Sequence, residues 1–146
     1  MIKSLLAFIT LLGAVAAPAL AAPAAGVAYK VVVNSANAAP PMSRDEVAKL
    51  FLKKVTSWAT GQTVQPVDQA KDSAVRKAFS QAVLGKDVSA VESYWQQAIF
   101  SGRGVPPSEK SSDAEVLAFV RANPNAIGYV SGGADLGASV KELPVN

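Results

Sequence analysis

The chain of 146 residues contains neither cysteine nor histidine. Without cysteine it forms no disulfide bonds, so its stability has to come from packing alone. Histidine is the usual general base near neutral pH and the commonest metal ligand. Together the two absences exclude Ser-His and Cys-His catalysis, zinc sites built on histidine or cysteine, and haem held by histidine.

The groups left for acid–base chemistry are carboxylates, and we interpret them as structural. Asp45 and Glu46 are adjacent, and Asp113 and Glu115 are one residue apart. Each pair is predicted to lie in the first turn of a helix, where acidic side chains cap free amides and interact favourably with the helix dipole. We therefore expect no catalytic residue, no metal site, no cofactor and no enzymatic activity.

Basic residues are also few and scattered. The formal net charge is +3, and the longest basic run is the pair Lys53-Lys54. A nucleic-acid-binding protein usually carries a basic patch or stripe on one face. Nucleic acid is therefore not an expected partner.

The first residues resemble a secretory signal. Lys3 and the terminal amine carry positive charge, an uncharged and mostly apolar run follows from Leu5 to Ala17, and small residues stand at Ala19 and Ala21. This order is typical of a signal peptide that is removed after export. The apolar run is shorter than the roughly 20 residues needed to span a bilayer. We expect a signal peptide over residues 1–21, a single domain over 22–146, export of the protein, and no membrane span after cleavage.

The mature region alternates predicted strands and helices. Strands are expected at 29–34, 63–67, 126–131 and 140–143. Helices are expected at 44–54, 73–84, 90–100 and 113–122. This alternation predicts an α/β domain with a small mixed sheet and about four helices. Three helices are predicted to begin with the Ser-x-x-Glu pattern of a capping box, at Ser43–Glu46, Ser89–Glu92 and Ser112–Glu115.

The start of the helix at 73–84 is the strongest candidate for a binding site. A helix N-terminus offers free amides and the positive end of its dipole, so it can hold an anion. Here the amide of Ala74 is flanked by the Ser73 hydroxyl and by Arg76, whose guanidinium suits phosphate-like oxyanions. From these residues alone, a capped helix with an exposed arginine is the favoured interpretation, and an anion site at Ser73, Ala74 and Arg76 competes with it.

Residues 42–79 (MSRDEVAKLFLKKVTSWATGQTVQPVDQAKDSAVRKAF) resemble a stretch of the periplasmic phosphate-binding proteins of bacterial import systems. In that family a helix with the pattern IFxGKxxxW precedes a strand ending PV.R and a helix opening SGTR..F. Residues 126–130 (AIGYV) resemble a later strand of the same family. The resemblance covers about residues 43–130. It implies one lobe of the type II periplasmic-binding-protein fold, with inorganic phosphate or a related oxyanion as the ligand and a periplasmic location. The signal pattern alone also fits a free extracellular protein.

The resemblance is incomplete at the anion site. Ser73 and Arg76 match the family pattern, whereas Ala74, Val75 and Gln69 stand where glycine, threonine and an anion-binding arginine are usual. The Gly/Ser-rich anion loop is absent, because residues 35–40 follow the first strand instead. A lost hydroxyl costs about 0.5–1.5 kcal/mol and a lost charged partner about 1.5–3 kcal/mol. The resemblance therefore implies binding weakened by roughly 30-fold or more.

Two functions follow from this sequence. The first is an exported protein like the substrate-binding component of a phosphate ABC transporter, which holds phosphate or a similar oxyanion weakly. The second is an accessory module of the cell envelope that kept the fold, lost the ligand and acts through a protein partner. The family pattern favours the first function, and the departures at Gln69 and Val75 favour the second.

Overall fold

The computed structural model describes residues 27–146, so the predicted signal peptide and its cleavage site lie outside the described residues. Five strands form one mixed sheet in the order β3-β2-β4-β1-β5. β1 (Tyr29–Asn34) runs antiparallel to its neighbours β4 (Ala126–Ser131) and β5 (Val140–Glu142). β2 (Gln65–Gln69) runs parallel to β4 and to β3 (Ser108–Lys110). The predicted α/β class with a small mixed sheet is confirmed.

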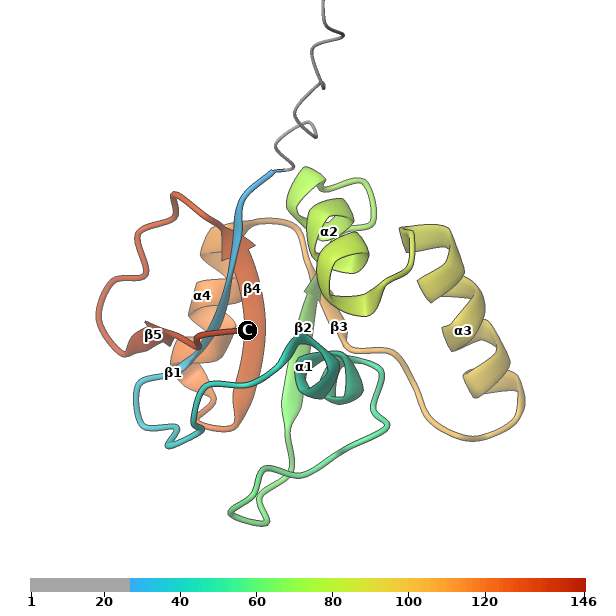
Figure 1. Ribbon diagram of the computed structural model, residues 1–146, viewed down its shortest axis with the longest axis horizontal. Helices are drawn as coiled ribbons and strands as arrows, with labels where there is room; N and C mark the ends of the chain where they lie inside the picture. Colours follow the sequence, from blue (N-terminus) through green and yellow to red (C-terminus); the bar gives the residue numbers. More distant parts are fainter. Residues whose placement is uncertain (1–26) are drawn as a thin grey trace, which may run out of the picture.

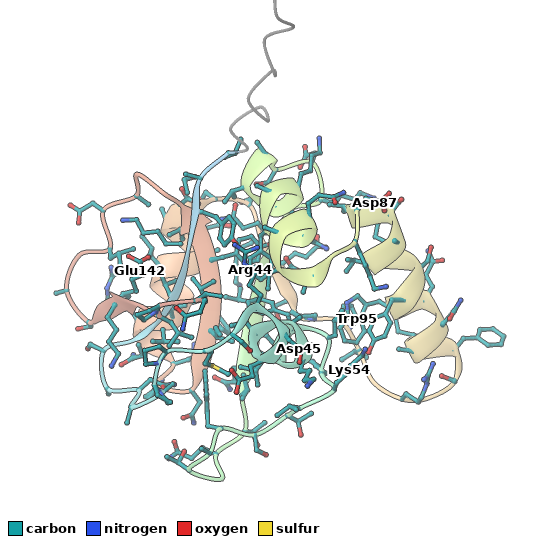
Figure 2. The ribbon with its side chains drawn as sticks, viewed as in Figure 1. Arg44, Asp45, Lys54, Asp87, Trp95 and Glu142 are labelled. Atoms are coloured by element: carbon teal, nitrogen blue, oxygen red, sulfur yellow. The ribbon has the colours of Figure 1, made fainter. Side chains whose placement is uncertain are left out.

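Helices cover both faces of the sheet (Figure 1). One face carries α1 (Arg44–Phe51) and α2 (Ala74–Phe79), which continues as the π-helical segment η1 (Ser80–Leu84). The opposite face carries α4 (Asp113–Ala122). The remaining helix, α3 (Val88–Phe100), lies beside the sheet, and its Trp95 points toward α1 (Figure 2). The prediction of about four helices is confirmed.

The sheet divides the core into two layers because successive strand residues point to opposite faces. Val31 and Val33 pack beneath α1 and α2, whereas Val32 packs against α4. In the first layer the rings of Phe79 and Tyr129 are stacked, with centroids 3.9 Å apart. This stack fixes α2 above β4, next to the candidate site.

Gly128 lets α4 approach β4 closely. A β-carbon at this position would lie 2.8 Å from side-chain carbons of Val67 and Val116, which is closer than such atoms pack. The absent side chain therefore allows α4 to pack closely against β4 and β2.

Several predicted boundaries are wrong by one to three residues. β2 spans 65–69 rather than 63–67, so Asp68 and Gln69 belong to the strand. α1 ends at Phe51 rather than at residue 54, because Lys53 has the left-handed φ of 53° that a helix does not continue through. β5 ends at Glu142, and the short strand β3 was not predicted.

The three predicted capping boxes have different outcomes. The box of Ser43 and Glu46 is complete. Ser112 caps α4, but the carboxylate of Glu115 accepts the amide of Ser111 instead of that of Ser112. The third box is wrong, because α3 begins at Val88 and is capped by Asp87 rather than by Ser89. Asp87 is the cap because its carboxylate accepts a hydrogen bond from the Ala90 amide at 2.8 Å.

Within residues 27–146 no helix is both long and apolar enough to cross a bilayer.

Candidate anion site

Ser73 stands at the end of β2, where the chain turns into α2. Its Oγ accepts a hydrogen bond from the Arg76 amide at 3.3 Å, so the predicted helix cap is confirmed. The same hydroxyl donates to Oε1 of Gln69 at 3.2 Å. Its single proton is therefore used within the protein. Ala74 is exposed and lines a wide surface hollow together with Tyr29 and Lys77.

Arg76 points into the protein and is only 2% exposed, so the expectation of an exposed arginine is wrong. Its Nε lies 3.2 Å from Oδ1 of Asp68, within ion-pair distance but without a well-directed hydrogen bond. Its Nη1 donates to the carbonyl oxygen of Gln69 and lies 3.4 Å from Oε1 of Glu109. The sequence pattern placed Arg76 correctly at the start of α2 but could not show its direction.

Asp68 connects Arg76 to Tyr129. The Tyr129 hydroxyl donates to Oδ1 of Asp68 and accepts the Gln69 amide at 3.1 Å. Burial raises the pKa of Asp68, although Arg76 and Tyr129 oppose that shift. Burial and the neighbouring Asp68 raise the pKa of Tyr129, so this phenol remains a neutral donor. One guanidinium thus faces two carboxyl groups, those of Asp68 and Glu109.

Gln69 bridges the ends of β2 and β4. Its Nε2 donates to Oδ1 of Asp113 at 2.8 Å and to the carbonyl oxygen of Tyr129 at 3.1 Å. The same Asp113 oxygen accepts the Ser131 amide at 3.1 Å. Burial acts to raise the pKa of Asp113, but hydrogen bonds from Ser131 and Gln69 outweigh it and lower the pKa overall. Asp113 is therefore anionic at neutral pH.

Asp113 is the member of this site that sequence reasoning missed. The sequence assigned it to the first turn of a helix, which is where it lies in α4. The sequence did not show that β2 pairs with β4. Because the two strands are parallel, their carboxyl ends lie at the same edge of the sheet. At that edge the Asp113 carboxylate accepts hydrogen bonds from the Gln69 side chain and from the Ser131 amide.

The polar side chains of the candidate site are engaged with one another. Ser73 is half-buried, Gln69 and Arg76 are buried, and each of the three already has a hydrogen-bond partner within the protein. An incoming oxyanion has to replace one of these partners and lies close to the negative charge of Asp113. Val75, where the phosphate-binding family has threonine, is 4% exposed and belongs to the core, as its place on the apolar stripe predicted.

The chain is similar in fold to solved structures of proteins from phosphate transport. No protein-family model and no curated protein sequence matches the chain. An ABC-type phosphate transport receptor from Vibrio cholerae matches with a TM-score of 0.60 and 21% identity over 82% of this chain. PstS from Borrelia burgdorferi matches with a TM-score of 0.65 and 15% identity, again over 82%. A phosphate ABC transporter substrate-binding protein from Clostridium perfringens, solved with bound phosphate, matches with a TM-score of 0.63 and 19% identity over 82%.

The chain has the fold of one part of these phosphate-binding proteins. It covers 46%, 45% and 47% of the Vibrio, Clostridium and Borrelia chains, which is under half of each. At these identities the likeness shows the fold alone. The prediction of a single lobe with the periplasmic-binding-protein fold is confirmed, and the ligand has to be argued from the site itself.

Proposed function

We propose that this protein is an exported substrate-binding-like protein of the phosphate transport type, which holds phosphate or a similar oxyanion weakly. The observation that carries the proposal is the position of Ser73, which caps α2 directly beyond β2 in a fold shared with a phosphate-bound protein. Export rests on the signal pattern of residues 1–21, and the periplasmic location rests on the likeness to phosphate transport proteins. The expected role is passive capture of the anion, without catalysis.

The contacts of the site explain why the affinity should be weak. To bind the anion, Ser73 has to exchange its bond to Gln69, and Gln69 has to exchange its bond to Asp113. Each exchange replaces an existing hydrogen bond, so its net contribution is small. The charge of Asp113 opposes the anion further. We expect dissociation constants in the millimolar range, where binding free energies are near −4 kcal/mol.

An amide NMR titration with phosphate and then with sulfate tests this function. Saturable shifts centred on residues 73–76 are expected, and Ser73→Ala should abolish them. Ser43→Ala is the matched control, because Ser43 also caps a helix but lies at the start of α1. No shifts up to tens of millimolar would contradict the proposal.

A second candidate is an envelope accessory module that has the fold but no anion ligand. The observation that favours it is the internally paired network, in which Arg76 faces Asp68 and Glu109 while the Ser73 hydroxyl donates its hydrogen bond to Gln69. This function predicts no response to phosphate and a reproducible protein partner in envelope crosslinking. A protein that is monomeric and captures no partner would count against it.

A further inference from the structure

A pocket of about 380 Å³ lies at the opposite end of the sheet from Ser73. It is lined by residues 36–42 after β1, residues 58–60 and 62 before β2, and residues 124–125 before β4. Strand pairing places these segments together, since Gln65 at the start of β2 pairs with Ala126 at the start of β4. Pockets of roughly 300–1,000 Å³ hold small organic ligands. This pocket is therefore large enough for a ligand and separate from the anion site.

Most of the pocket wall is apolar and firmly held. Trp58 is 7% exposed, and its Nε1 donates to the carbonyl oxygen of Asn125 at 3.0 Å. Met42 packs against the main core, and its amide donates to the carbonyl oxygen of Pro144 at 3.0 Å. Ala39 also packs against the core, and the Asn37 side chain accepts its amide at 2.8 Å. The wall is thus anchored to the core from several directions, which favours a preformed pocket.

Glu46 is the charged side chain in the lining. Its Oε2 accepts both the amide and the hydroxyl of Ser43, at 2.7 and 2.9 Å. These bonds lower the pKa of Glu46, so the carboxylate is ionised at neutral pH. The neighbouring cation Lys49 pairs with Asp45 instead, at 2.7 Å. With Oε2 engaged by Ser43, Oε1 is left to accept a donor from a ligand.

We propose that this pocket binds a small organic cation, with an apolar body against Trp58 and Met42 and one ammonium group against Glu46. The negative charge of Glu46 favours a positively charged ligand, and the apolar wall favours a ligand with an apolar group. An engineered cavity of about 150 Å³ accommodates benzene, so a pocket of this size has room for roughly ten to fifteen non-hydrogen atoms. The proposal is independent of phosphate binding at Ser73.

Titration with phenethylamine, followed by NMR of backbone amides and indole N–H groups, tests the pocket. The Trp58 indole and the amides of Ala38 and Thr60 should shift saturably at about millimolar concentrations. The Trp95 indole is an internal control, because it lies in the separate cluster beneath α3. The neutral analogue 2-phenylethanol should bind about two- to fivefold more weakly, as expected for a partly exposed ion pair. The anion phenylacetate should bind more weakly still.

Substitution of Glu46 distinguishes charge recognition from simple apolar binding. Glu46→Gln keeps a residue that completes a capping box, and it should make the amine and the alcohol bind equally. Glu115→Gln is the matched control, because Glu115 is also an exposed carboxylate held by a serine, Ser111, but lies on α4. It should leave the preference for the amine unchanged. Ala59→Phe places a large ring at the exposed rim and should abolish binding of all three probes.

Three results would overturn the proposal. The first is that the Trp58 indole shows no saturable shift up to about 20 mM amine. The second is that phenylacetate binds more tightly than phenethylamine. The third is that Glu46→Gln and Glu115→Gln have equal effects on the preference for the amine. Phosphate binding is measured by the amide shifts of residues 73–76 instead. The two titrations therefore show separately whether each site binds its ligand.

Discussion

The Nε atom of Arg76 lies 3.2 Å from Oδ1 of Asp68, and both side chains are almost completely buried. A buried charge is tolerated only when it is paired and hydrogen-bonded. Here Tyr129 supplies a third member by donating to the same Asp68 oxygen. The cation expected to face a ligand thus holds α2 onto β2, and this placement changes how the protein should respond to mutation.

Arg76→Ala should destabilise the fold by about 3–5 kcal/mol, because it leaves the Asp68 carboxyl buried without its partner. Urea denaturation followed by circular dichroism measures this loss. The double variant Arg76→Met with Asp68→Leu removes both partners and should be markedly more stable than Arg76→Ala. Equal stability of the two variants would contradict a buried ion pair.

This placement also affects how anion binding should be tested. Loss of binding in Arg76→Ala would be expected from disruption of the fold alone. Ser73→Ala, which removes one hydroxyl from a half-buried cap, is therefore the more informative variant.

Gly128→Ala should cost about 1–3 kcal/mol, because its new methyl group would overlap Val67 and Val116 and overpack the layer beneath α4. Gly133→Ala is the matched control, since a β-carbon there would meet no atom within 4 Å. Its effect should stay within about 0.5 kcal/mol. Thermal and urea unfolding of both variants test the close packing of α4 on β4, and equal losses would contradict it.

Asp113 should stabilise the protein in a pH-dependent way. Its pKa in the folded protein is lowered from the reference value of 3.8, so its contribution is present above that value. The contribution is lost as the pH falls through the folded pKa. Asp113→Asn should therefore flatten the acid side of the stability profile, measured as urea midpoints between about pH 2.5 and 6.

The control for this profile is Glu142→Gln, an exposed substitution on β5 (Figure 2). Its profile should follow that of the unmodified protein. Asp68 acts in the opposite direction, because its raised pKa favours the folded state when protonated and that stabilisation is lost as the pH rises. A profile that is unchanged by Asp113→Asn would show that Ser131 and Gln69 do not hold the carboxylate as described.

Gln69→Arg combined with Asp113→Asn should strengthen phosphate binding by roughly 10-fold or more. The first change supplies a charged donor at the end of β2, worth about 1.5–3 kcal/mol, and the second removes the competing carboxylate. Isothermal titration calorimetry or the NMR titration measures the gain. Gln62→Arg combined with Glu142→Gln makes the same change in net charge away from this site and should give no comparable gain. Equal gains from both variants would indicate attraction by net charge rather than a site.

Much of the local structure could be predicted because its causes are local. The run of valines in 29–34 and the AIGYV segment predicted β1 and β4, and the stripe through Val75 and Phe79 predicted α2. Caps at Ser43 and Ser73 fixed where two helices begin. The predicted position of β2 was wrong by two residues because Asp68 and Gln69 are polar. Composition alone does not show that a polar strand end is buried.

The candidate site depends on partners that are far apart in the chain. Tyr129 follows Asp68 by 61 residues, and Asp113 follows Gln69 by 44. A short-range pattern cannot show that these side chains meet, because their proximity results from the pairing of β2 with β4. The pocket at Trp58 has the same origin, since its three lining segments are joined by the sheet.

The sequence by itself determined the class of the fold, the positions of most helices and strands, and the serine that caps α2, because propensity, apolar spacing and capping act over a few residues. The tertiary structure alone decided that Arg76 turns inward, that Asp113 reaches the end of β2, and that a second pocket forms at the other end of the sheet. Burial and strand pairing decide these features, and both depend on residues that are distant in the chain.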